Sequence, residues 1–208
     1  MLILGKLPYK IRIVRVMIDP MEKFNCWWDT AKKNSPLKQK NAICLSTIDN
    51  LGYPNARFID LKKADDKGFV FCSYLDSKKG HEINNNSNVA LTAWWDHCGF
   101  QIRITGTARL LPDSENDKYW LTRTHTAQLT TSISNQSQIL DDEESLTKQF
   151  HTLEKELQNK EIPRPKNWGG YQVTPISIEF LTFKESRLHL REFFELTEGK
   201  WCQCLLQP

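Results

Sequence analysis

Cationic side chains gather in one stretch of the sequence, residues 57–79. Lys78 and Lys79, at its end, follow Asp76 and Ser77, and either of these residues can cap the N-terminus of a helix. Lysines in the first turn of a helix oppose the helix dipole, an arrangement that favours an anion bound to the exposed N–H groups. The stretch therefore predicts a phosphate-binding site, while a solvated basic surface explains the same residues.

The pattern around these lysines is that of a β-hairpin that leads into a helix. Apolar-rich runs at 57–63 and 69–74 flank an Asp-Asp-Lys-Gly turn, in which Gly68 can take the positive φ that a short loop requires. The helix is expected to run to about Asn86. The hairpin adds three more side chains to the predicted anion site, namely Arg57, Lys62 and Ser73.

The rest of the chain favours an antiparallel, mainly β fold with flanking helices. Apolar or alternating runs predict strands at 42–48, 89–95 and 100–111, and further strand begins at Val173. Consecutive strands with few helices between them are typical of a closed or half-open antiparallel barrel. Helices are predicted from Asp19-Pro20 to about 34, from Pro112 to beyond Tyr119, and over 141–160, and Trp168-Gly169-Gly170-Tyr171 is predicted to make a turn.

Polar residues in the middle of the chain are further candidates for ligand binding. Gln101, on a predicted strand, can offer an amide to a ligand or simply be an exposed glutamine. Tyr119 and Arg123 lie near the end of a predicted helix. Residues 124–138 are rich in Thr, Ser, Gln and Asn, a composition that fits either a flexible loop or the wall of a ligand site.

Three potential cations recur with a period of two near the C-terminus, at Arg187, His189 and Arg191. In a strand they share one face. Like charges on one face repel each other unless anions lie between them, so a bound ligand explains the pattern as well as a solvent-facing basic ladder does.

Composition limits the classes of protein to which the chain can belong. A formal net charge of +3 over 208 residues is far from the basic surface of a nucleic-acid-binding protein. The six cysteines are expected to be reduced and mostly buried, with no metal at Cys202 and Cys204. Lysines and arginines interrupt the apolar N-terminus, and we expect a cytoplasmic protein without a membrane span. The predicted organisation is an N-terminal arm, 1–18, and one domain, 19–208.

From about residue 20 onward the chain resembles the pyridoxamine/pyridoxine 5′-phosphate oxidases, flavoproteins with an FMN-binding split β-barrel. The resemblance rests on the order and spacing of several short motifs. They are Arg57 to Lys62, Ser77-Lys78-Lys79, Gln101, Tyr119-x-x-x-Arg123, Gln136-Ser137, Pro163 with Trp168-Gly169-Gly170, Ile178-Glu179-Phe180, and Arg187-Leu188-His189-x-Arg191.

By this resemblance the chain is a homodimer with FMN at the subunit interface. The resemblance implies oxidation of the 4′ carbon of pyridoxamine or pyridoxine 5′-phosphate, with a hydride passing to FMN and O2 reoxidising it to give H2O2. Lys62, Tyr119 and Arg123 hold the substrate phosphate, and Arg187 and His189 are catalytic and flank the pyridine ring. The implied FMN-binding residues are Arg57, Lys62, Cys72, Ser73, Lys78, Lys79, Gln101, Gln136, Ser137 and Arg191.

Three positions depart from the family pattern. Leu181 stands where the family has a Trp that contacts the flavin. Ala127 stands where a Ser assists the substrate phosphate, and Asp60 stands where the family has an apolar strand residue beside the flavin. Residues 1–18 show no match to the family's N-terminal Arg-x-x-Tyr lid. These departures keep two other hypotheses open: a flavin oxidase of the same fold for another aromatic substrate, such as a reduced phenazine precursor, and a non-catalytic binder of flavin or pyridoxal phosphate.

Overall fold

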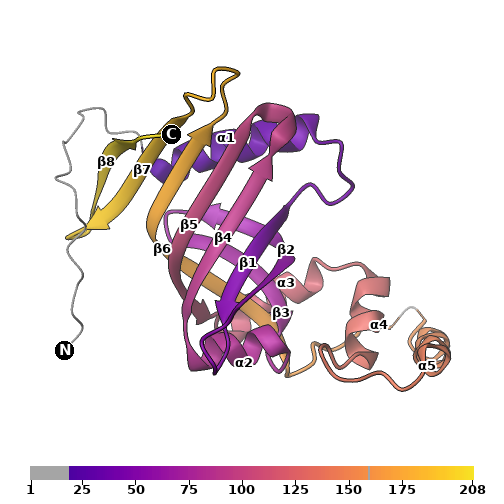
Figure 1. Ribbon diagram of the computed structural model, residues 1–208. Coiled ribbons are helices and arrows are strands. Elements are labelled where there is room, and N and C mark those ends of the chain that lie inside the picture. The colour runs from indigo at the N-terminus through magenta and orange to yellow at the C-terminus, as the bar shows by residue number, and fades with distance from the viewer. Residues whose placement is uncertain (1–18, 159) are drawn as a thin grey trace.

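The computed structural model describes residues 19–158 and 160–208, so the predicted arm lies outside the described residues (Figure 1). The strands are β1 (Ala42–Ile48), β2 (Pro54–Asp65), β3 (Gly68–Tyr74), β4 (Asn88–Trp95), β5 (Phe100–Leu110), β6 (Trp168–Thr182), β7 (Leu190–Thr197) and β8 (Lys200–Leu206). The helices are α1 (Pro20–Asn34), α2 (Lys78–Asn85), α3 (Asp113–Leu121), α4 (His125–Ile133) and α5 (Glu143–Glu156), with a 3₁₀ turn at Asp96–Cys98. No helix in these ranges is long and apolar enough to cross a membrane.

The strands form one antiparallel sheet in the order β3-β2-β1-β4-β5-β6-β7-β8, and β3 also pairs with β6. This second pairing closes the first six strands into a barrel, while β7 and β8 extend beyond it (Figure 1). The antiparallel barrel predicted from the sequence is thereby confirmed. β6 joins the two parts, because its first residues pair with β3 and its last residues pair with β7.

The barrel interior holds the main core, and α1 covers one end of it (Figure 1). Asp19 caps α1 by accepting a hydrogen bond from the Met21 amide at 2.8 Å, and Pro20 occupies the first turn, as expected of a helix start. From α1, the fully buried Phe24 meets Phe69 of β3 edge to face, with 4.8 Å between ring centroids. A smaller core under α3, α4 and α5 is built around Trp120, Leu129 and Trp168.

The predicted hairpin is confirmed as β2 and β3, with Gly68 at φ 115°. The register shifts between Leu61 and Lys63, so Lys62 sits in a β-bulge, a feature that re-aims side chains. Ser77 caps α2, which confirms the predicted helix start and puts both lysines in its first turn.

Two predictions near the C-terminus were wrong. The Trp168-to-Tyr171 segment is not a turn but the start of β6, where the glycines allow close packing: a Cβ on Gly170 would lie 2.7 Å from a Leu111 methyl carbon. The residues before Leu190 do not form a strand either, and Arg187 has a left-handed φ of 61°. Arg187, His189 and Arg191 therefore do not share a strand face, since only Arg191 belongs to β7.

Three smaller differences concern helices and cysteines. Part of the 124–138 segment is helical, as α4, because Thr124 caps it through the Ala127 amide. α5 is shorter than the predicted 141–160 and buries no residue fully. All six cysteines are free, as expected, but only Cys204 is buried.

Gly68 and Gly52 offer a matched test of the hairpin. Both have positive φ, but a Cβ at Gly68 would lie 2.0 Å from the Val173 carbonyl oxygen, whereas a Cβ at Gly52 meets nothing within 4 Å. Gly52→Ala should lower the free energy of unfolding by about 1 kcal/mol, the backbone cost alone. Gly68→Ala should lower it by about 3 kcal/mol or more, because the clash adds to that cost. Urea denaturation measures both, and equal losses would contradict the close approach of β3 and β6.

Candidate active site

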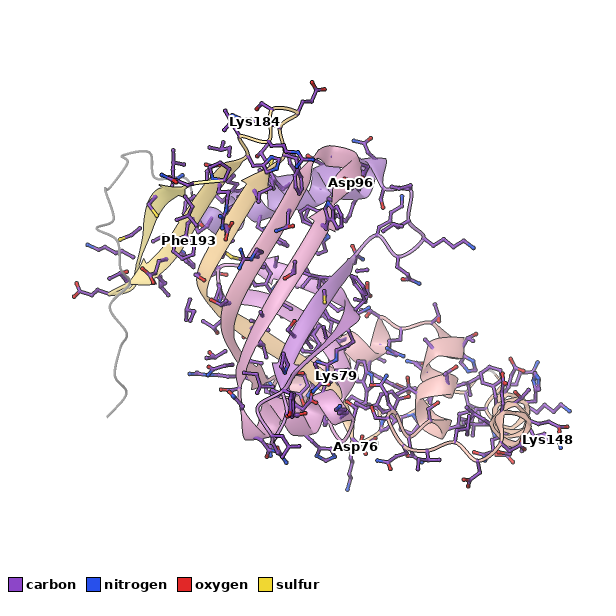
Figure 2. The ribbon with its side chains drawn as sticks, viewed as in Figure 1. Asp76, Lys79, Asp96, Lys148, Lys184 and Phe193 are labelled. Carbon is purple, nitrogen blue, oxygen red and sulfur yellow. The ribbon has the colours of Figure 1, made fainter. Side chains whose placement is uncertain are left out.

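The N-terminal end of α2 holds a buried ammonium group, that of Lys79, which is 9% exposed (Figure 2). Its Nζ donates to Ser73 Oγ at 3.0 Å, to Ser77 Oγ at 3.1 Å and to Gln136 Oε1 at 2.5 Å. Burial, aided by the charge of Arg57, lowers the pKa of Lys79 to about 8. A buried cation whose hydrogen bonds go to uncharged oxygens is arranged to receive an anion.

Arg57 and Lys78 lie beside this group and share a buried carboxylate. Glu82, 4% exposed, accepts a hydrogen bond from Arg57 Nη2 at 2.9 Å and lies 3.9 Å from Lys78 Nζ. Thr47 and Asn55 also donate to Glu82, at 2.5 and 2.9 Å. Glu82 thus orients the outer cations of the predicted anion site, a role that sequence analysis missed. Its spacing of four residues from Lys78 on one helix face was the available signal.

A second group of predicted site residues surrounds Cys72 of β3. Burial raises the pKa of Cys72 to about 11, and the positive charges of Lys62 and Arg123 oppose that rise. Burial also raises the pKa of Tyr119, and the positive charge of Lys63 opposes that rise. The charges of Lys62 and Arg123 both act on Cys72, and the phosphate-binding set of Lys62, Tyr119 and Arg123 stays a prediction.

Arg123 is the most unusual member of this second group. Its Nη2 donates to the Ala127 carbonyl at 3.0 Å and to Thr131 Oγ1 at 2.7 Å, while its buried Nε has no hydrogen-bond partner among the residues that the structure describes. The guanidinium lies over the rings of Trp120 and Trp168, 5.6 and 5.0 Å from their centroids. Burial lowers the pKa of this group, although it stays charged at neutral pH. An unpartnered buried N–H on a cation marks a place for an anionic oxygen.

Four other predicted residues, Gln101, Arg187, His189 and Arg191, lie at the other end of the barrel. Gln101, Leu181 and Arg191 are neighbours across β5, β6 and β7 in one row of the sheet. Arg191 Nε donates to Glu179 Oε1 at 2.7 Å, and its Nη1 donates to the Gln207 carbonyl at 3.0 Å. Glu179, 6% exposed, also pairs with Arg103 at 3.2 Å. Sequence analysis quoted Glu179 in a family motif but gave it no role, because its pairing with Arg103 depends on the register of β5 and β6.

Arg187 and His189 lie in the loop between β6 and β7, near Lys184 (Figure 2). His189 Nδ1 accepts a hydrogen bond from the Lys184 amide at 3.1 Å, so the proton of a neutral ring is on Nε2. The ring packs edge to face against Phe183. Arg187 is exposed, and its backbone amide donates to the Lys184 carbonyl at 2.9 Å. The loop thus presents an imidazole N–H and a guanidinium without burying either.

Two sequence profiles match most of the chain. The profile described as pyridoxamine 5′-phosphate oxidase covers residues 30–156, and that described as the pyridoxine 5′-phosphate oxidase C-terminal dimerisation region covers residues 168–208. A protein of Leptospira biflexa named pyridoxine/pyridoxamine 5′-phosphate oxidase is 40% identical over 190 residues, which cover 91% of this chain and 89% of the relative. The chain belongs to the pyridoxine/pyridoxamine 5′-phosphate oxidase family. A relative of the same name from Nostoc punctiforme is 36% identical over 94% of this chain and 91% of its own length.

Solved structures agree with membership of this oxidase family. PhzG from Burkholderia lata 383, in complex with tetrahydrophenazine-1-carboxylic acid, superposes with a TM-score of 0.86 at 30% identity and covers 95% of this chain and 100% of its own. A pyridoxamine 5′-phosphate oxidase-related, FMN-binding protein of Nostoc punctiforme shares the fold, with a TM-score of 0.75 at 13% identity, 93% of this chain and 100% of its own. Membership of the family makes the chain an oxidoreductase and FMN its cofactor, and the cations with uncharged partners at Lys79 and Arg123 suit phosphorylated ligands.

The lowered pKa of Lys79 predicts how stability depends on pH. Between about pH 8 and 10.5 the unfolded chain keeps the Lys79 proton while the ligand-free folded protein releases it. Because the unfolded state then binds more protons, this lysine makes stability rise with pH across that window. The free energy of unfolding of the wild type minus that of Lys79→Met should therefore be about 2 kcal/mol larger at pH 10 than at pH 7.5.

Urea denaturation of the FMN-free protein at both pH values measures this difference. The control is Lys78→Met, because Lys78 is exposed and bonded to Asn55. Its difference from the wild type should change little with pH. A Lys79 difference that is also constant would contradict the buried, deprotonating amine.

Proposed function

We propose that the protein oxidises pyridoxine 5′-phosphate or pyridoxamine 5′-phosphate to pyridoxal 5′-phosphate, with O2 as the electron acceptor and H2O2 as its product. The observation that carries this proposal is the buried Arg123 guanidinium, whose Nε has no hydrogen-bond partner among the described residues, while the charges of Arg123 and Lys62 act on the same thiol. A phosphate monoester supplies the oxygens that this group lacks. The family membership and the names of the curated relatives support the same substrate.

FMN supplies the acceptor for the hydride that leaves the 4′ carbon of the substrate. We propose that the α2 group binds the FMN phosphate through Arg57, Ser73, Lys78 and Lys79, with Gln136 and Ser137 closing over it. Gln136 already bonds Lys79, and Ser137 takes the positive φ of 75° that turns the chain there. Gln101 and Arg191 are proposed to contact the flavin from the other end of the barrel, Arg191 being held by Glu179.

The chain's own residues bind and orient the substrate. Lys62, Tyr119 and Arg123 hold the phosphate by charge-assisted hydrogen bonds, each worth about 1.5–3 kcal/mol when well formed. Arg187 and His189 flank the pyridine ring and keep the 4′ carbon against the flavin, where a displacement of about 1 Å costs about 100-fold in rate. No nucleophile is required. When the substrate is the amine, water releases ammonia from the oxidised product.

We propose that each site is shared by two copies of the chain. Ser73 pairs with Gly169 near the start of β6, and Gln101 pairs with Leu181 near its end. The twelve residue steps from Gly169 to Leu181 span up to about 40 Å of strand, well beyond the length of FMN. In Figure 2, Lys79 and Lys184 accordingly lie at opposite ends of the molecule. The match to the dimerisation region and the exposed Phe58 and Trp94 on the outer sheet face support a homodimer.

Oxidation of a reduced phenazine precursor is the second candidate function. It is favoured by the similarity to PhzG, whose structure contains tetrahydrophenazine-1-carboxylic acid, and by Ala127 and Leu181, which leave more room and fewer hydroxyls at the site. That ligand bears a carboxylate but no phosphate, so it leaves the Lys62 and Arg123 pair less well matched than a phosphorylated vitamer does.

The six free thiols accord with the reducing cytoplasm, where we place the protein.

Anaerobic titration of the FMN-loaded protein tests the proposed function. Pyridoxine 5′-phosphate or pyridoxamine 5′-phosphate should bleach the flavin absorbance, and readmission of air should restore it with H2O2 formed. Unphosphorylated pyridoxine should bleach it far more slowly, because it leaves Arg123 unpaired. Bleaching by tetrahydrophenazine-1-carboxylic acid alone would favour the second candidate function, and bleaching by neither class would favour a non-catalytic binder.

A further inference from the structure

A carboxylate lies inside the cationic group proposed to hold the substrate phosphate. Asp60 and Lys62 both project from the outer face of β2, and Lys62 Nζ lies 2.6 Å from Asp60 Oδ2. The side chains are 45% and 30% exposed, so solvent and ligands reach both of them. The resemblance to the family assigns an apolar residue to this strand position, which makes the pair a feature of this chain.

The charge of Asp60 also reaches the buried side of the site. The carboxylate acts on the Cys72 thiol, whose pKa is raised to about 11 chiefly by burial. It acts on the Arg123 guanidinium as well, where it opposes the lowering of the pKa that burial causes. Asp60 is thus paired with Lys62 and its charge acts on Arg123, so the two cations of the proposed phosphate site are accompanied by one carboxylate.

The bulge in β2 leaves the Lys62 side chain able to bind either Asp60 or a ligand. Leu61 pairs with Phe71 and Lys63 pairs with Val70, so Lys62 is the extra residue between two regular pairs. Its side chain is not locked by the sheet ladder. A partly exposed ion pair such as the one with Asp60 is weak, so a phosphate with two negative charges can compete for the same ammonium group.

We propose that Asp60 is a specificity-determining residue that weakens phosphate binding: it holds Lys62 while the site is empty, and the ligand phosphate must displace it. The inference rests on the proposed function, since it takes the ligand phosphate to lie between Lys62 and Arg123. A site with both cations uncompensated binds the phosphorylated product tightly and releases it slowly. Asp60 reduces that attraction and speeds the release of pyridoxal 5′-phosphate.

The test compares the binding of pyridoxal 5′-phosphate and of unphosphorylated pyridoxal by the FMN-loaded protein, measured by calorimetry. Asp60→Asn should bind pyridoxal 5′-phosphate about threefold to tenfold more tightly than the wild type, with little change for pyridoxal. The gain should vanish in the Lys62→Ala background, because Asp60 acts on the ligand through Lys62. The matched control is Asp29→Asn, which removes an exposed carboxylate paired with Lys32 on α1 and should leave both affinities unchanged.

Two results would overturn the role of Asp60. Equal affinities of wild type and Asp60→Asn would show that the carboxylate does not compete, and weaker binding by Asp60→Asn would show that it helps to place Lys62. Failure of the proposed function has a different signature, in which the wild type is not bleached by the phosphorylated vitamers at all. Urea denaturation of the same variants measures any loss of protein stability. Such a loss would not tighten the binding of one ligand alone.

Discussion

The pairing of β6 with strands on both sides is the constraint on which the rest of the structure depends. Its start closes the barrel against β3, and its end carries β7 and β8. Because β6 is continuous from Trp168 to Thr182, the residues at its two ends are kept apart. The proposed anion-binding groups at α2 and Arg123 therefore belong to one end of the molecule, and the loop between β6 and β7 belongs to the other (Figures 1 and 2).

Buried positive charge determines what the end of the molecule with α2 and Arg123 can bind. Lys79 and Arg123 are both largely buried, and within the described ranges their hydrogen bonds go to hydroxyl, amide or carbonyl oxygens. Keeping such cations desolvated lowers stability, as the lowered pKa of Lys79 shows. Carboxylates pair with other cations: Glu82 holds Arg57, Glu179 holds Arg191, and Asp60 pairs with Lys62. This distribution of charge is the one expected of a protein that binds anionic ligands.

Local chemistry made much of this fold predictable from sequence. The caps at Asp19 and Ser77 and the turn at Gly68 require only neighbouring residues, and the helix and hairpin they predict were confirmed. The features that the sequence did not predict depend on tertiary contacts. Gly169 and Gly170 were taken as turn residues, whereas they lie in a strand because Asn116 and Leu111 pack against them.

The same distinction between local and tertiary causes applies to the site residues. The motifs grouped Lys62, Tyr119 and Arg123 as a phosphate-binding set, which stays a prediction, whereas a strict period of two suggested a strand where Arg187 and His189 form a loop. Glu82 was missed because a carboxylate two thirds of the way along a helix is usually solvated, and only the fold buries it beneath Thr47 and Asn55. Neither the loop nor the buried carboxylate depends on local sequence alone.

Complementation between two inactive variants tests the shared site most directly. Arg123→Ala removes the phosphate end of the site and Arg187→Ala removes the ring end, so each homodimer should be inactive with pyridoxine 5′-phosphate. After subunit exchange in an equal mixture, half of the dimers are mixed, and each mixed dimer has one intact site. Activity should then return to about a quarter of the wild-type value. A mixture that stays inactive, although mixed dimers are shown to form, would place the whole site within one chain and contradict the account.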